Sequence, residues 1–336
     1  MCIRDSYKKT KDLLLNATLA PSMGFLSAYR NVGSVSNSGL EFTIDTKNIQ
    51  TKEFSWTSSF NISFNRNKVL SLNDDEPSLA SRVNWGNFNN AYPYIAIPGH
   101  PIAMFYGHIF DGVYQYTDFD KVGESYILKD GVPNNGNARE KIQPGDIKFK
   151  DINRDGVVND YDLTIIGNPN PKHIGGFGNN FQYKNFDLNV FFQWSYGGDV
   201  LNANRIEFEG GDPNARTSLN MFASFANRWT PENQTNELYR IGGQGPAVYS
   251  SRTIEDGSFL RLKTVALGYR LPNAWLKKIN IKSLRVYASA QNLITWTKYS
   301  GPDPEVSTRP TALTPSFDWS PYPRPRTITL GVDISF

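Results

Sequence analysis

The chain has 336 residues and a formal net charge of +3, from 35 basic and 32 acidic side chains. This balance, without any run of five basic residues, excludes an obvious nucleic-acid-binding protein. Three histidines and one cysteine are too few for a conventional zinc site, and no glycine-rich nucleotide motif or nucleophile elbow indicates an enzyme. No apolar stretch approaches the ~18 residues of a transmembrane helix, although 13% of the residues are aromatic.

The first six residues, Met1–Ser6, form neither a signal peptide nor a helix start. They resemble one reading frame of a common transposon sequencing adapter, so we interpret residues 1–6 as a sequencing scar and exclude them from fold reasoning. The lack of a signal peptide then says nothing about the location of the protein. After the scar, Tyr7–Leu15 is a candidate strand.

Alternation of apolar and polar residues predicts β-strands along the chain. In Phe54–Phe64, aromatic and aliphatic residues share one face, and serine, threonine and asparagine share the other. Further strands are predicted at Leu40–Asp45, Gly175–Tyr183, Phe186–Trp194, Phe259–Tyr269, Leu284–Gln291 and Thr327–Phe336. Ile102–Val113 and Asp146–Lys150 could supply two more. The apolar residues change from even to odd positions between Leu262 and Val265, which predicts a β-bulge.

The predicted connections alternate between short and long. Lys184-Asn185 is tight and Pro272–Lys282 is moderate, whereas Gly197–Asp256 and Thr295–Arg326 are long. Short turns on one side and long loops on the other are typical of outer-membrane β-barrels, and the serine- and asparagine-rich strand faces suit a water-filled lumen. The apolar faces are then predicted to contact lipid.

The last ten residues, Thr327–Phe336, alternate strictly over the length of a tilted membrane-spanning strand. An aromatic residue in the last position, Phe336, resembles the signal that outer-membrane barrels present to the barrel assembly machinery. If Phe336 lies in the periplasm, the two long connections are extracellular. The alternative for this strand, taken alone, is an edge strand of a soluble sandwich.

The segment Asp151–Asp162 has the spacing of a calcium-binding loop. Gly156 at position 6 permits the sharp turn that such a loop makes around a hard cation. The predicted oxygen ligands are Asp151, Asn153, Asp155, Asn159, Asp162 and the backbone carbonyl of Val157. The loop resembles the dockerin-type EF-hand variant, which ends in aspartate, and a structural calcium ion is predicted there. The alternative is a turn held by Asx hydrogen bonds.

Aromatic residues are frequent in the predicted loops. They could stack on sugar rings, pack the loops together, or meet a partner protein. They are Tyr92, Tyr94, Trp229, Tyr239, Tyr249, Trp296, Trp319 and Tyr322. Trp56, Trp194 and Trp275 are instead predicted to lie at the membrane interface.

Several motifs, in their order along the chain, resemble one family. They include "FSWTSSFNISFNRNKVLSL", "GHPIAMFYGHIFDGVYQ", "PGDIKFKDINRDGVVNDYDLTIIGNPNP" and "LRVYASAQNLITWTKYSGPDPEV". Together they resemble the carboxyl-terminal part of the SusC/RagA family of TonB-linked outer-membrane proteins, the nutrient importers of Bacteroidota. The resemblance covers residues 7–336, with 114–172 as an extracellular loop region that contains the EF-hand-like segment 151–162.

The resemblance implies an all-β protein, namely part of an antiparallel transmembrane barrel of ~22 strands. It also implies import of oligosaccharides or peptides, a SusD-type surface lipoprotein as partner, and energy from the TonB complex through an amino-terminal part not present here. Two other functions stay open on the residues alone. One is a soluble extracellular carbohydrate-binding β protein with a dockerin-like calcium loop, and the other is a passive porin.

Overall fold

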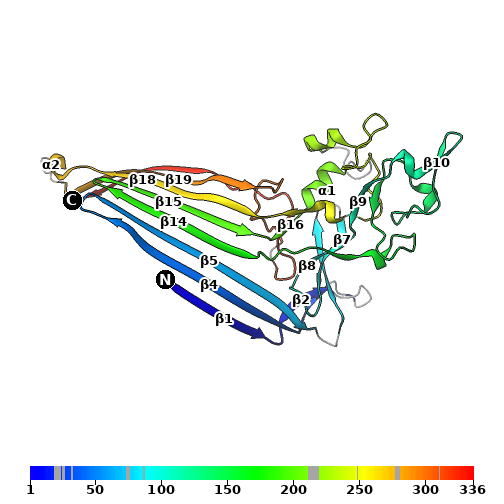
Figure 1. Cartoon of the computed structure of the whole chain (residues 1–336), viewed down its shortest axis with the longest axis horizontal. Coiled ribbons are helices and arrows are strands. Elements are labelled where there is room, and N and C mark those ends of the chain that lie inside the picture. Colours follow the sequence, from blue (N-terminus) through cyan, green and yellow to red (C-terminus); the bar gives the residue numbers. More distant parts are fainter. Residues whose placement is uncertain are drawn as a thin grey trace.

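The computed structural model shows an all-β protein built around one large antiparallel sheet (Figure 1). The residues it describes are 1–18, 24, 27–31, 33–72, 76–85, 88–210, 219–247, 249–276, 281–309 and 311–336. In sheet order, the eight strands are β1 (Cys2–Thr10), β4 (Ser34–Gln50), β5 (Phe54–Ser71), β14 (His173–Tyr183), β15 (Phe186–Tyr196), β18 (Phe259–Arg270), β19 (Ser283–Thr297) and β21 (Thr327–Ser335).

The order of strands in this sheet follows the order of the chain, and every neighbouring pair is antiparallel. The strands predicted from alternation are confirmed, including the pairing of the terminal strand β21 with β19. The first strand runs from Cys2 to Thr10 and not from Tyr7 to Leu15 as predicted. Although residues 2–6 pair with β4, their origin as a sequencing scar stays a prediction.

The register places apolar side chains opposite apolar side chains. Phe60 of β5 pairs with Phe177, and Phe177 pairs with Phe192 of β15. In β18 the register shifts between Leu262 and Thr264, which confirms the predicted bulge. A one-residue slip would otherwise turn the apolar residues to the opposite face, so the bulge lets both halves of β18 keep one apolar face.

The predicted alternation of connections is also confirmed. At one end of the sheet, residues 51–53, residues 184–185 and a short segment that carries α2 (Asn273–Leu276) join adjacent strands. At the other end, the connections 72–172, 197–258 and 298–326 fold into one packed unit, which we call the loop body (Figure 1). The C-terminus lies at the tight-turn end.

Two segments that could have crossed the membrane lie instead in the loop body. Ile102–Val113 contains β8 (Met104–Gly107) and β9 (Phe110–Val113), and Asp146–Lys150 contains β12 (Ile147–Phe149). None of the three joins the large sheet. Strands of 3–4 residues are too short to cross a membrane. In β8, the consecutive residues Met104 and Phe105 are both buried, so both faces of this strand are covered by the loop body.

The remaining elements are short. The strands are β2 (Leu14–Thr18), β3 (Ser27–Asn31), β6 (Leu79–Trp85), β7 (Phe88–Ala96), β10 (Phe119–Val122), β11 (Ser125–Leu128), β13 (Thr164–Gly167), β16 (Asp199–Asn202), β17 (Ile254–Asp256) and β20 (Phe317–Asp318). The helices are α1 (Ala203–Glu209) and the 3₁₀ turns η3 (Tyr116–Asp118), η4 (Arg139–Lys141), η5 (Asp160–Asp162), η6 (Ala223–Asn227) and η7 (Ser251–Thr253). Within the described ranges, no helix is long and apolar enough to cross a membrane.

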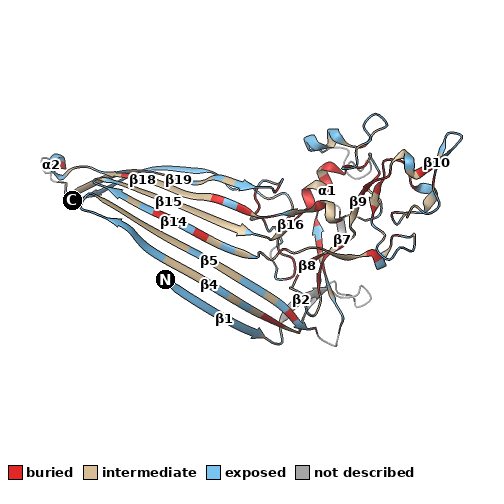
Figure 2. Cartoon of the chain, viewed as in Figure 1, coloured by how far each residue is buried: buried red, intermediate tan, exposed pale blue. Residues whose placement is uncertain are grey.

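The hydrophobic core lies mainly in the loop body and not beside the large sheet (Figure 2). Trp85 and Phe317 come from different connections and stack edge to face, with ring centroids 5.3 Å apart. Leu201, from a third connection, is fully buried in the same cluster. The three long connections therefore share one core, which holds them in a fixed arrangement at the end of the sheet.

Candidate functional site

One face of the large sheet is apolar and uncovered, and we call it the apolar face. Leu267 is 49% exposed in β18 and Leu330 is 80% exposed in β21. The same face carries Leu40, Phe42, Ile62, Phe177, Phe192, Val265, Val286 and Val332. A soluble sandwich would cover these side chains with a second sheet, and no described element does so.

Tryptophans mark both ends of the apolar face. Trp56 lies near the tight turns, and its indole Nε1 donates to Asn179 Oδ1 at 3.0 Å. Trp194 lies near the loop body and donates to His173 Nδ1 at 3.1 Å. The grouping of Trp296 with the loop aromatics was wrong, because Trp296 lies in β19 opposite Leu260 on the apolar face.

The opposite face of the sheet, which we call the polar face, carries charged groups that pair across several strands. Arg285 Nη2 lies 2.6 Å from Asp187 Oδ2, and its Nη1 lies 3.2 Å from Asp333 Oδ2. Gly268, in β18, lies between Arg285 of β19 and Asp187 of β15. A Cβ added at this glycine would lie 2.5 Å from Arg285 Nη2. The glycine therefore leaves the space that the guanidinium crosses to reach β15.

A second polar-face arginine fixes the connection 298–326 against the sheet. Arg261 is only 2% exposed, and its Nη2 lies 2.6 Å from Asp303 Oδ1. Its Nη1 pairs with Glu305, and its Nε donates to Thr295 Oγ1 at 3.0 Å. Arg324 completes the group, with 2.9 Å from its Nε to Asp303 Oδ2. Two acids lie between two arginines, so the buried charges balance.

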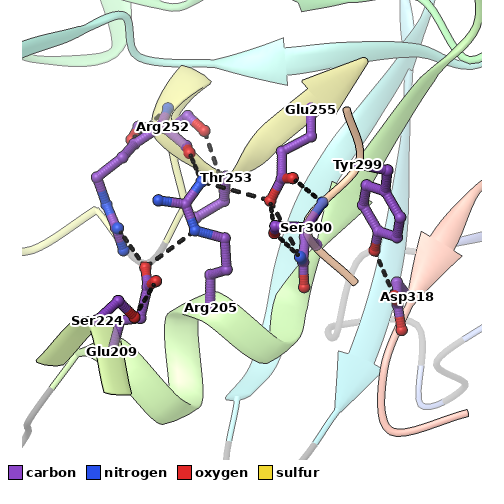
Figure 3. A network of polar contacts seen from close by, with 11 residues as sticks. Arg205, Glu209, Ser224, Arg252, Thr253, Glu255, Tyr299, Ser300 and Asp318 are labelled. Carbon is purple, nitrogen blue, oxygen red and sulfur yellow. Dashed lines mark hydrogen bonds and ion pairs between the residues drawn. The ribbon is translucent and has the colours of Figure 1, made fainter. Parts of the chain in front are cut away.

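Another polar network holds helix α1 against the strands β17 and β20 (Figure 3). Glu209 accepts from Arg252 Nη1 at 2.8 Å, and Arg205 also pairs with it. Burial opposes its charged form, but Arg205 and Arg252 outweigh that cost and hold the pKa of Glu209 below its ordinary value. The Tyr299 hydroxyl donates to Asp318, whose pKa is raised chiefly by burial.

The loop body contains a cavity of about 750 Å³. Its walls come from β7, β8, η5 and the residues Pro246, Ala247 and Tyr249, and four tyrosines line it: Tyr92, Tyr106, Tyr161 and Tyr249. Burial raises the pKa of Tyr249 to about 12. Burial also lowers the pKa of His108, which lines the cavity and stacks on Phe149 with ring centroids 5.3 Å apart.

The predicted calcium loop forms a compact turn between β12 and β13. Asp162 Oδ1 accepts from the N–H of Ile152 at 2.7 Å, and its Oδ2 accepts from the N–H of Asn159 at 2.9 Å. The carboxylate of Asp151 accepts the N–H groups of Arg154 and Gly156 at 2.6 and 2.8 Å.

Two more of the predicted ligand side chains also take backbone donors. Asn153 Oδ1 accepts from the N–H of Asp155 at 3.1 Å, and Asp155 Oδ1 accepts from the N–H of Val157 at 2.8 Å. Among the described residues, no three His, Cys, Asp or Glu side chains are grouped to hold a metal ion. These bonds match the Asx-turn alternative, and calcium binding stays a prediction.

The predicted assembly residue, Phe336, follows β21 and is 77% exposed. Among the described strands, β21 pairs with β19 alone, and β1 is the opposite edge of the sheet. The terminal strand thus presents an apolar face and an unpaired edge. The role of Phe336 in assembly stays a prediction.

The loop aromatics divide into three groups. Tyr94, Trp229 and Tyr239 are buried and Trp319 is partly buried, and these four residues pack the connections together. Tyr92 and Tyr249 line the cavity. Tyr322 is 92% exposed.

Sequence reasoning missed the buried group around Arg261 and the network around Glu209. Alternation places Arg261 on the polar face, but its partners lie more than forty residues away in an irregular connection. No local pattern indicates such a pairing.

Known proteins resemble this chain along almost its whole length. The chain is 35% identical over 333 residues to TonB-dependent receptor P3 of Formosa agariphila, covering 98% of this chain and 31% of that protein. It is 30% identical over 339 residues to TonB-dependent receptor SusC of Bacteroides thetaiotaomicron, covering 98% of this chain and 29% of that protein. The resemblance to SusC/RagA-type TonB-dependent receptors is confirmed. No family model matches the chain.

The fold agrees with this result. The solved structure of the RagAB peptide transporter matches 99% of this chain and 33% of its own chain, with a TM-score of 0.75 and 25% identity. The RagAB peptide importer in the "closed-closed" state matches with a TM-score of 0.74. The chain thus spans about a third of the length of the relatives that it matches.

Proposed function

We propose that this chain is part of a TonB-dependent active importer in the outer membrane of a Gram-negative bacterium. One observation carries the proposal: an antiparallel sheet with an uncovered apolar face, a polar opposite face, tight turns at one end and a packed loop body at the other. Such a sheet meets lipid on one side and water on the other. The apolar face then lies outward, and the loop body lies outside the cell.

The substrate class that we propose is glycans or peptides, captured together with a SusD-type surface lipoprotein. Support comes from the similarity to a receptor named SusC and to structures described as a peptide transporter. We propose further that the TonB complex supplies energy through a part outside this chain, and that the barrel assembly machinery inserts the protein. The segment 151–162 is proposed to bind calcium as a structural brace of the extracellular region 114–172.

A cell-based assay tests this function. The full-length gene product is expressed in its host, and uptake of fluorescent oligosaccharides and peptides is compared with that of a deletion strain, with and without a protonophore. We expect gradient-dependent uptake that the deletion abolishes, and a product that only detergent extracts from the outer membrane. Recovery of the folded product in a detergent-free soluble fraction would instead favour the soluble carbohydrate-binding protein. Uptake that the protonophore leaves unchanged would favour a porin.

A further inference from the structure

The tyrosine-lined cavity of the loop body has walls that other contacts already hold in place. Tyr249 lies against β8 at Gly107, where an added Cβ would come within 3.0 Å of Tyr249 Cε2. Its hydroxyl makes a hydrogen bond with the Tyr92 backbone. At the η5 wall, Asp162 Oδ2 accepts the N–H of Asn159 at 2.9 Å. The cavity is therefore preformed, as small-molecule sites usually are.

Charge restricts what this cavity can hold. None of the described lining residues is a lysine or an arginine. His108 is the one lining imidazole among them, and burial lowers its pKa, which disfavours the cationic form. The one lining carboxylate among the described residues is that of Asp160. Without a lysine or arginine in the described lining, a carboxylate or phosphate would exchange its hydration for uncharged hydrogen bonds alone, which are weaker than charge-assisted ones.

Size and shape favour a ligand of moderate length. The volume of about 750 Å³ falls within the range of roughly 300–1,000 Å³ that is typical of ligand sites. Tyrosine rings offer flat faces for the C–H faces of a sugar ring, and their hydroxyls, with the Asn159 and Asp160 side chains, offer polar partners for sugar hydroxyls.

We propose that this cavity binds a neutral oligosaccharide, which stacks on Tyr92 and Tyr249 and hydrogen-bonds at the rim formed by Asn159 and Asp160. The proposal rests on the proposed import function and narrows its substrate class at one extracellular site. Peptides and acidic sugars are disfavoured there because none of the described lining residues is a lysine or an arginine.

Binding to the purified full-length protein in detergent tests the proposal. The probes are four neutral hexasaccharides, from α-glucan, β-glucan, β-xylan and β-mannan, and a mixture of tryptic peptides. We expect at least one hexasaccharide to bind by calorimetry, and Tyr249→Ala and Tyr92→Ala to weaken it at least tenfold. Tyr322→Ala is the matched control, because Tyr322 is exposed and is not among the lining residues, and it should change nothing.

A filling variant keeps the test valid if a tyrosine variant fails to fold. Ala80 lines the cavity, and Ala80→Phe should weaken hexasaccharide binding at least tenfold without removing a wall. Unchanged binding in Ala80→Phe, or no binding of any hexasaccharide, would overturn the proposal. Loss of peptide binding alone would also overturn it, by assigning the cavity to peptides. Outer-membrane location and gradient-dependent uptake of the wild type are measured separately, so failure of the import function is distinguishable.

Discussion

Arg261 Nη2 lies 2.6 Å from Asp303 Oδ1, and this contact joins the wall of the large sheet to the connection 298–326. The guanidinium is almost fully buried and also pairs with Glu305, and Arg324 Nη1 lies 2.8 Å from Glu305 Oε2. The position of this connection over the polar face is therefore set by charge pairing as well as by the shared apolar core.

Replacing that arginine should release the connection. Arg261→Met leaves the carboxylates of Asp303 and Glu305 short of a buried partner, and breaking such a pair costs about 3–5 kcal/mol. We expect faster protease cleavage within 298–326 in the full-length protein, mapped by mass spectrometry, while the rest of the barrel stays resistant. Glu53→Gln is the control, because the exposed Lys184–Glu53 pair at 3.3 Å contributes about 0–1 kcal/mol. Equal cleavage in both variants would contradict the role of Arg261.

The two faces of β18 should respond differently to charge. Leu267→Arg places a guanidinium on the apolar face, which costs about 2–4 kcal/mol near the middle of a bilayer. Ala266→Arg, one residue away, points to the polar face and should cost much less. Urea unfolding of the full-length protein in lipid vesicles measures both. Similar losses for the two variants would show that lipid does not cover the apolar face.

Removal of the terminal aromatic ring should impair assembly. Phe336→Ala in the full-length protein is expected to lower the amount of assembled barrel in the outer membrane, read by the heat-modifiable shift on a gel. Pore properties of the molecules that do assemble should be unchanged, because residue 336 shares the parity of the apolar residues of β21. Ser335→Ala is the matched control. Wild-type membrane levels of Phe336→Ala would remove the support for an assembly signal.

Calcium should stabilise the region around Asp151–Asp162. At calcium concentrations well above Kd, a ligand that binds only the folded state raises Tm, and we expect this shift in the full-length protein. Asp155→Ala removes a predicted ligand and should reduce the shift, whereas Asp160→Asn, in the same loop but outside the ligand set, should retain it. No calcium-dependent shift at millimolar calcium would assign the segment to an Asx turn.

The sequence predicts the large sheet well because its information is local. Alternation along Phe186–Trp194 and the parity slip near Leu262 determine which residues share a face, and the register follows from pairing those faces. The arrangement of the loop body cannot be predicted from local patterns because the residues in contact are distant in sequence. Trp85 packs on Phe317, and nothing near either residue indicates the other. The short strands that begin at Met104 and Ile147 are wrongly predicted as membrane crossings because the contacts that bury them in the loop body are also distant in sequence.

The cavity, too, could be predicted only in part, because its walls come from segments that are distant in sequence. The sequence indicates Tyr92 and Tyr249 as loop aromatics but does not indicate Tyr106 and His108, because only the fold brings β8 beside Ala247 and Tyr249. The space itself depends on small residues such as Gly107, whose effect is visible only when Tyr249 is seen against it.

Cysteine accessibility along β15 in intact outer membranes tests most directly whether the large sheet spans the membrane. Single cysteines replace Leu188, Asn189, Val190, Phe192 and Gln193 in a full-length protein from which any other cysteine has been removed. We expect a period of two: a water-soluble maleimide labels positions 189 and 193, whereas probes at 188, 190 and 192 are quenched only by a lipid-soluble quencher. Uniform labelling, or labelling of the apolar positions from water, would contradict a membrane-spanning sheet.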